Sequence, residues 1–218
     1  MPKEVKEQEG LSLVMVTKDG TVKKTPAAAF KEVRRSGLIG ITLDKGDALI
    51  RAQFARKGDD IMLTTAKGQS IRFKESEVRE MGRQAAGVRG MKLSSGDVIV
   101  GTGIVPKDAK TAELLVVSST GYGKKTKLSE YKTQGRGGSG IKTMSITAKT
   151  KQLVGAAVLV DQSGELVAMS KKSQTIRTGL NEIPTLSRAT QGVRVMKMRD
   201  ADSLASFVVF PETEEVKE

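Results

Sequence analysis

The sequence contains no cysteine, no histidine and no tryptophan, and it has only five phenylalanines and two tyrosines among 218 residues. Without cysteine the chain can form no disulfide framework, and a reducing compartment is permitted. Without histidine and cysteine, Ser-His-Asp catalysis and the usual zinc ligand sets are excluded. The scarcity of aromatic rings argues against single-stranded nucleic acid as the partner, because its bases stack on such rings.

Long hydrophobic runs are also missing from the sequence. No apolar run approaches the roughly 18 residues that a membrane-spanning helix needs. Residues 1–10 lack the hydrophobic segment of a secretory signal, so we expect a cytoplasmic protein with no membrane partner. Acidic pairs such as Asp59 and Asp60 favour turns over a cation site, and we expect no metal site.

Negative charge is scarce between the two ends of the chain. The sequence has 37 Lys and Arg against 25 Asp and Glu, a formal net charge of +12. Residues 1–10 and 211–218 are both acidic, so we expect acidic flexible tails there and a strongly basic body over 11–210. A body this basic usually has a polyanionic partner, although a solubilising surface is the simpler alternative.

One pattern occurs four times along the body. Gly20 recurs 48 residues later as Gly68, which recurs 53 residues later as Gly121, and Arg136 recurs 52 residues later as Arg188. A period near 50 residues with mostly strand-like content is typical of propellers and related radial β arrays. We therefore expect one domain of four units, at about residues 11–56, 57–106, 112–160 and 161–210.

Each copy contains four runs that predict strands. An apolar run such as 61–64 leads through a glycine turn to a short second strand, which indicates a β-hairpin. A polar connector of about ten residues leads to an alternating run such as 88–93, and a final apolar run follows. The fold predicted is all-β, a propeller-like radial array of about four four-stranded blades. The fourth copy has Ser173 in place of the turn glycine, so we expect a different turn there.

Basic residues fall at equivalent positions in the repeats. In a radial array these columns would form a belt of charge on the outer rim, suited to the phosphates of a bent duplex. The alternative is surface charge that was copied by duplication and has no function. The predicted contact residues are Lys24, Arg72, Lys125 and Arg177 in one column, Arg83, Arg136 and Arg188 with Arg34 and Arg35 in a second, Arg89, Lys142 and Arg194 in a third, and Lys23, Lys74, Lys124 and Lys132 beside them.

Two motifs suggest chemistry that their context does not support. Residues 135–140 match G-x-G-x-x-G, but the alternating run that follows predicts a strand, where a dinucleotide site needs a helix. We interpret this connector as a turn whose backbone can lie close to phosphates, with Arg136 as its charge. Tyr122 lies at a hairpin turn with no base nearby. We expect no catalytic residue and no enzymatic activity from the chain alone.

Five strings carry a family resemblance, at residues 19–25, 59–73, 77–93, 121–143 and 189–198. They resemble the C-terminal domain of the DNA gyrase A subunit, over roughly 11–210. The resemblance implies a β-pinwheel whose neighbouring blades exchange a strand, with double-stranded DNA wrapped around a basic rim in support of negative supercoiling. It also implies two partners in the bacterial nucleoid, namely the gyrase B subunit with the rest of the gyrase A subunit. ATP and magnesium would act only in those parts, and no cofactor is expected in this chain.

The sequence departs from the family pattern in two places. The family's domain usually has about six such repeats, against four here. Its wrapping motif, Q-R-R-G-G-K-G, has no full counterpart, because residues 134–140 read Q-G-R-G-G-S-G. One alternative is therefore the C-terminal domain of the topoisomerase IV C subunit, which need not wrap DNA. Another alternative is a propeller that binds a protein partner.

Overall fold

The computed structural model describes residues 10–32 and 36–210. These residues form strands and short 3-10 turns, and no helix among them is long and apolar enough to cross a bilayer. The strands are β1 Leu11–Thr17, β2 Thr21–Pro26, β3 Leu49–Arg56, β4 Asp60–Thr65, β5 Gln69–Lys74, β6 Val88–Arg89, β7 Ile99–Val105, β8 Glu113–Ser118, β9 Tyr122–Lys127, β10 Ile141–Lys142, β11 Leu153–Leu159, β12 Glu165–Ser170, β13 Thr175–Gly179, β14 Val193–Arg194 and β15 Leu204–Phe210. The 3-10 turns are η1 Ala27–Phe30, η2 Glu75–Glu77, η3 Leu128–Glu130 and η4 Leu180–Glu182.

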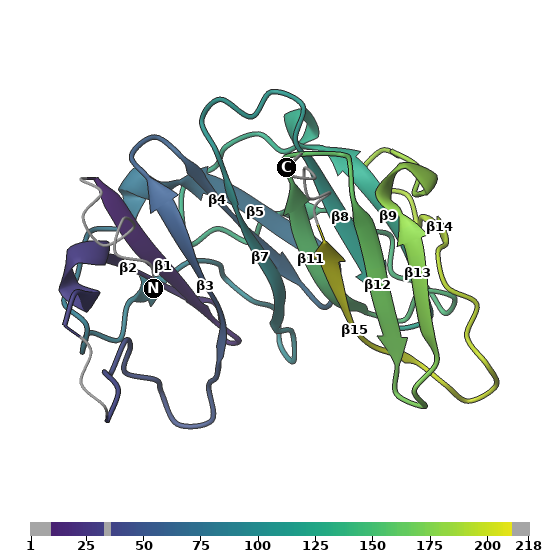
Figure 1. Ribbon diagram of the computed structural model, residues 1–218, viewed down its shortest axis with the longest axis horizontal. Helices are drawn as coiled ribbons and strands as arrows, with labels where there is room; N and C mark the ends of the chain where they lie inside the picture. The colour runs from purple at the N-terminus through teal and green to yellow at the C-terminus, as the bar shows by residue number, and fades with distance from the viewer. Residues whose placement is uncertain (1–9, 33–35, 211–218) are drawn as a thin grey trace, which may run out of the picture.

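The predicted β-pinwheel is confirmed. Each repeat contributes an antiparallel hairpin and a strand that pairs with its first member, such as β4 with β5 and β7. The four blades stand side by side in chain order, from β1–β3 at the left to β12, β13 and β15 at the right (Figure 1). The final strands of the repeats, β3, β7, β11 and β15, form the inner edges of the blades.

The fourth strand of a blade comes from the next repeat. β6 pairs with β2, β10 pairs with β5, and β14 pairs with β9, so each alternating run completes the preceding blade. Its assignment to the blade of its own repeat, made from the spacing alone, is wrong, and the exchange implied by the family resemblance is what the chain adopts. Each exchanged strand has only two paired residues, and it covers the outer edge of a hairpin that would otherwise be open.

The cores lie between the blades. On β4, Ile61 and Leu63 pack with β1 of the first blade, and Met62 packs on the other face with Leu114 of the third blade. A strand buried on both faces is apolar at consecutive positions, which explains why the first run of each middle repeat lacks alternation. On β12 of the last blade only one face is covered, and Met169 is 48% exposed.

Glycines on β7 let two inner strands touch. Gly101 makes a parallel bridge to Ala156 on β11, which joins the second and third blades into one eight-stranded sheet. A β-carbon at Gly101 would lie 2.5 Å from the Ala156 amide nitrogen, and one at Gly103 would lie 2.4 Å from the Val158 side chain. A larger residue on β7 would therefore push the two inner strands apart.

The ends of the array and the fourth turn differ from the repeat pattern. No described strand covers the outer edge of β13, and residues 38–43 lie in no strand. Ser173 has φ 63°, close to 81° at Gly121, and its amide donates to Ser170 as the Gly121 amide donates to Ser118. The expectation of a different turn is therefore wrong, because serine here adopts the left-handed conformation of the glycines.

Gly101→Ala should lower the free energy of unfolding by about 1–3 kcal/mol, because the added methyl group overlaps the β11 backbone. Urea denaturation measures the change. Gly135→Ala is the matched control, since nothing lies within 4 Å of a β-carbon at that position. Equal unfolding midpoints for the two variants would show that the contact between β7 and β11 is not tight.

Candidate nucleic-acid interface

Lys23 and Lys124 lie inside the domain and not on its rim. Both side chains are 0% exposed. The Lys124 Nζ donates to the carbonyl oxygens of Ser187 and Arg188 at 2.5 and 2.6 Å, and the Lys23 Nζ donates to those of Gly40 and Arg83. A group without exposed surface cannot reach a phosphate, so Lys23 and Lys124 cannot be DNA contacts in this structure. Their amines instead attach a hairpin to the connector that crosses it.

The first predicted column of cations is a column of ion pairs. Arg72 on β5 binds Asp60 on β4 at 2.7 Å, and Lys125 on β9 lies 3.5 Å from Glu113 on β8. Arg177 pairs with Glu165 in the same cross-strand arrangement, and Lys24 pairs with Glu75 of the next repeat. Lys24 and Lys125 are buried, Arg72 is half-buried and Arg177 is exposed. This column mainly clamps hairpins, and its charge is largely neutralised.

The connector arginines hold neighbouring repeats together. The Arg136 amide donates to the Glu77 carboxylate at 2.7 Å, and its guanidinium donates to the carbonyl oxygens of Glu77 and Arg89. Arg188 repeats this arrangement, with Glu130 at its amide and Lys142 O at its guanidinium, at 3.0 and 2.9 Å. Both side chains are half-buried. Their charge remains near the rim, but their hydrogen bonds serve the fold.

The third column is the one that faces solvent. Arg89, Lys142 and Arg194 occupy the second position of β6, β10 and β14, the outermost strands of their blades, and all three are exposed. The Arg194 guanidinium lies 5.7 Å from the centre of the Tyr122 ring, a cation–π distance. Lys74 and Lys132 are exposed as well, and Arg83 is half-buried in its connector. Arg34 and Arg35 lie outside the described residues.

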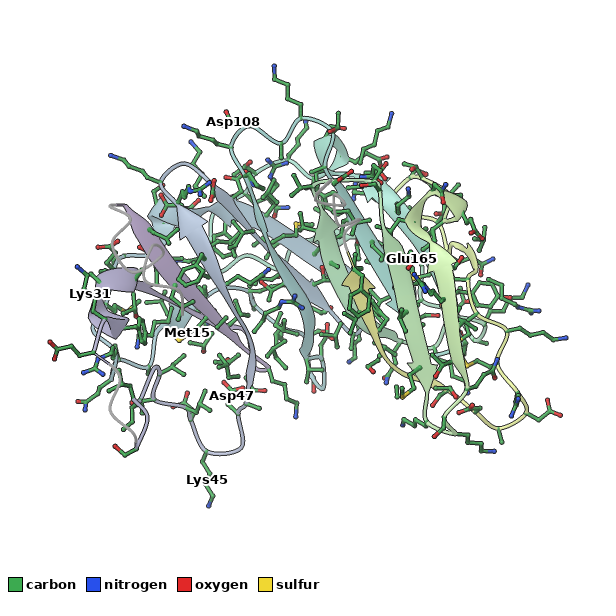
Figure 2. All side chains as sticks on the ribbon, in the orientation of Figure 1. Met15, Lys31, Lys45, Asp47, Asp108 and Glu165 are labelled. Carbon is green, nitrogen blue, oxygen red and sulfur yellow. The ribbon has the colours of Figure 1, made fainter. Side chains whose placement is uncertain are left out.

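Sequence reasoning missed two exposed cations beside this column. Lys92 and Lys197 follow the exchanged strands at equivalent positions, three residues beyond Arg89 and Arg194. The register of the repeats could have identified them, since they share a column of their own. Figure 2 shows side chains that end in nitrogen around the whole outline, with the labelled Lys31 and Lys45 pointing away from the sheets. The positive surface is therefore broader than the three columns.

The glycine-rich connector 134–140 packs against the exchanged strand of the preceding repeat. The Gly137 amide donates to Gly90 O at 2.8 Å, and Gly138 O accepts from the Lys92 amide at 2.9 Å. Strand β10 begins directly after the connector, as expected, and no helix follows that could form a dinucleotide site. The Gly137 amide and the Gly138 carbonyl are therefore used by contacts within the domain, while the exposed cations lie on the strands beside the connector.

Burial changes the proton affinity of two groups beneath the rim. Desolvation lowers the pKa of Lys124 from 10.5 to about 8, against the opposing attraction of Glu130. Burial also raises the pKa of Tyr131 to about 12, and its hydroxyl lies 2.5 Å from Thr143 Oγ1. Arg188 lies over the Tyr131 ring at 5.9 Å. At the junction between the third and fourth repeats, buried polar groups therefore pack together beneath the Arg188 side chain.

Fold and site together define a class, a repeat domain of pinwheel blades whose outermost strands present exposed cations. The family model described as the DNA gyrase C-terminal domain, a β-propeller, matches residues 12–55, 59–106, 112–159 and 164–211. The DNA gyrase A subunit of Mycolicibacterium smegmatis is 38% identical over 208 residues, which cover 94% of this chain and 24% of that protein. The Pseudomonas aeruginosa protein of the same name is 39% identical over 200 residues, or 92% and 21%. The chain thus spans about a quarter or less of these relatives.

Solved structures agree with the sequence relatives. A DNA gyrase A C-terminal domain superposes with a TM-score of 0.81 at 28% identity, over 93% of this chain and 67% of that one. A C-terminal domain of DNA topoisomerase IV gives 0.88 at 27% identity, over 97% and 65%. This chain belongs to the DNA gyrase C-terminal domain family, which confirms the resemblance seen in the sequence.

The stability of the protein should rise with pH through the Lys124 amine. Between pH about 8 and 10.5 the unfolded chain binds a proton at this residue that the folded chain does not, so the free energy of unfolding increases with pH across that window. Lys124→Met removes this contribution. Urea denaturation at about pH 7 and about pH 10 should show a gain for the wild type relative to the variant.

The exposed Lys127 on the same strand provides the control, because Lys127→Met should follow the wild type at both pH values. If Lys124→Met and Lys127→Met change in parallel with pH, the amine of Lys124 is not desolvated.

Proposed function

We propose that this chain is the part of a type II topoisomerase that binds and bends duplex DNA, with the phosphates held along the outer edges of its blades. Support comes from membership in the gyrase family, from the net charge of +12 and from the exposed cations of the exchanged strands. In this proposal the partners are the gyrase B subunit with the rest of the gyrase A subunit. Cleavage of DNA, ATP and magnesium belong to those parts.

The observation that carries this proposal is the position of Arg89, Lys142 and Arg194. One of them lies in each of the first three blades, in one register, on the strand farthest from the inner edge. Neighbouring connectors fix the strand backbone, since Arg136 and Arg188 bind the carbonyl oxygens of Arg89 and Lys142. Cations on a rigid backbone at regular intervals suit the regular phosphates of a duplex, and long flexible side chains reach phosphates without reading bases.

The side-by-side arrangement of the blades also bears on the shape of the bound DNA. A duplex that follows successive outer edges must curve with the array (Figure 1). Smooth bending of 20–30 base pairs costs about 1–6 kcal/mol, which phosphate contacts on several blades would offset. A single strand finds few rings to stack on here, because Tyr122 already has Arg194 beside its ring, Tyr131 is buried, and Phe210 is the only exposed phenylalanine among the described residues.

Reversing the charge of the three exposed cations tests the proposed rim. The triple variant Arg89→Glu, Lys142→Glu and Arg194→Glu should bind duplex DNA far more weakly than the wild type, regardless of base sequence. With about eight phosphates neutralised, the wild-type slope of log K against log salt should be near −7. The slope of the variant should be shallower by about three, because three phosphate contacts are lost. Fluorescence anisotropy over a salt series measures both quantities.

The matched control carries Lys45→Glu, Lys107→Glu and Lys149→Glu, which change the net charge equally at exposed positions off the exchanged strands. It should bind more tightly than the rim variant at every salt concentration. Equal losses in both variants would mean that only net charge matters and would contradict the rim. A salt slope near zero in the wild type would favour a protein partner for this surface.

A second candidate is a domain of the topoisomerase IV type that binds DNA without full wrapping. The TM-score of 0.88 to a topoisomerase IV domain favours it, as does the incomplete wrapping motif at residues 134–140. The sequence relatives, which are gyrase A subunits, favour the first candidate. The two differ in whether bound DNA follows a chiral path.

The topology of bound DNA decides between the two candidates. If the rim wraps DNA, ligation of a nicked plasmid in the presence of this chain should give a linking-number shift proportional to bound protein, visible on an agarose gel. The rim triple variant should give none at the same protein concentration. Salt-sensitive binding by the wild type without a linking-number shift would favour the topoisomerase IV type, which binds DNA without full wrapping.

A further inference from the structure

Strand exchange depends on a glycine in the donated segment. Gly87, Gly140 and Gly192 precede β6, β10 and β14, and all three have positive φ. A β-carbon on these glycines would lie 2.8, 2.5 and 2.5 Å from a carbonyl oxygen of the accepting hairpin. Each donated segment therefore approaches the accepting strand at a point where only glycine fits.

A second glycine lies in the turn of the accepting hairpin. The carbonyl oxygen of Gly20 accepts from the Gly90 amide at 2.7 Å, that of Gly68 from Thr143 at 2.8 Å, and that of Gly121 from Val195 at 2.8 Å. A β-carbon on these turn glycines would lie 3.1, 2.7 and 2.2 Å from the carbonyl oxygens of Met91, Met144 and Met196. Each junction therefore needs two glycines, one from each repeat.

Within the described residues no hairpin accepts the segment 37–43 of the first repeat, which is equivalent to the three donated segments. The Thr42 amide donates to Ala85 O at 3.3 Å, as Lys92 donates to Gly138 and Ser145 donates to Thr190, so the next connector holds the segment in its donor position. Gly37 keeps a φ of 78°, and no described atom lies within 4 Å of a β-carbon there. Ile39 at 60% and Leu43 at 40% are exposed.

The last hairpin is an acceptor with one substitution. Ser173 stands where the other three turns have glycine, with the same left-handed backbone and the same turn hydrogen bond. Within the described residues no amide donates to its carbonyl oxygen, and no strand pairs with the outer edge of β13. By analogy with the β-carbons placed on Gly20, Gly68 and Gly121, the β-carbon of Ser173 would lie against the carbonyl oxygen of a donated segment.

We propose that Ser173 is an end cap that prevents this chain from associating head to tail with further copies of itself. The segment 37–43 is equivalent to the donated segments of the other junctions, and β13 of another copy offers an uncovered outer edge with serine in place of the turn glycine. Such a contact joins two different surfaces, so it would propagate into open chains of molecules. An uncovered strand edge invites this pairing, and one side chain in the turn blocks it.

Replacing the cap by glycine tests the proposal. Ser173→Gly should self-associate as its concentration rises to about 1 mM, in sedimentation velocity or light scattering, while the wild type stays monomeric. Glycine suits the positive φ of this turn, so folding should be kept. Ser173→Ala retains the β-carbon and should stay monomeric. A second change, Ile41→Asp in the donor segment, should return Ser173→Gly to the monomer.

A disulfide tests the register of the contact, because the chain has no cysteine of its own. Thr21 faces Arg89 and Tyr122 faces Arg194 across their junctions, which places Gln174 opposite Ile39 of another copy. Paired strands hold opposed residues within disulfide range. Ile39→Cys with Gln174→Cys should therefore give cross-linked oligomers in the Ser173→Gly background and monomers in the wild-type background.

Several outcomes would overturn the proposal. These are a monomeric Ser173→Gly, self-association of Ser173→Ala to the same extent, oligomers of Ser173→Gly that do not cross-link in this register, and cross-linked oligomers in the wild-type background. None of these outcomes depends on DNA, so the experiments test the end cap independently of the proposed function.

Discussion

The structure depends on the backbone contact at which a repeat completes the blade before it. Two paired residues per exchanged strand are few, and other groups secure the contact. The carbonyl oxygen of a turn glycine does so at all three junctions, a connector arginine at the β6 and β10 junctions, and a buried lysine at the β6 and β14 junctions. Desolvation of an amine is costly, so the bonds of Lys124 to two carbonyl oxygens must offset it. The pinwheel is therefore held by polar contacts between repeats as much as by its apolar cores.

Much of the fold could be predicted from the sequence because repetition supplies information that a single unit lacks. The period near 50 residues indicated the number of blades, and the continuous apolar runs marked strands buried on both faces. The partner of the alternating run could not be read from spacing, because pairing within a repeat and pairing with the preceding one leave the same pattern. The missing turn glycine was visible at Ser173, but the effect of its β-carbon depends on a carbonyl position that only the structure gives.

The candidate site was predicted less well, since cations were counted without their acidic partners. Asp60, Glu113 and Glu165 form a column as regular as that of Arg72, Lys125 and Arg177, and the two columns neutralise each other across a hairpin. Reading acidic and basic columns together would have shown this clamp. Burial of Lys23 and Lys124 had no such signal, because the alternation of a short second strand does not say which face a connector covers.

The same junctions that hold the blades also carry the cations proposed to meet DNA. Arg89 and Lys142 present their side chains to solvent while their carbonyl oxygens are bound by Arg136 and Arg188 of the next repeat. A junction that opens moves its cation away from the rim, so a ligand that needs several cations at once binds only the closed form. By mass action such a ligand stabilises every junction that it spans. An array of weakly paired strands thus suits a polyanion that contacts many blades together, whereas a compact partner on one blade would leave the other junctions unsupported.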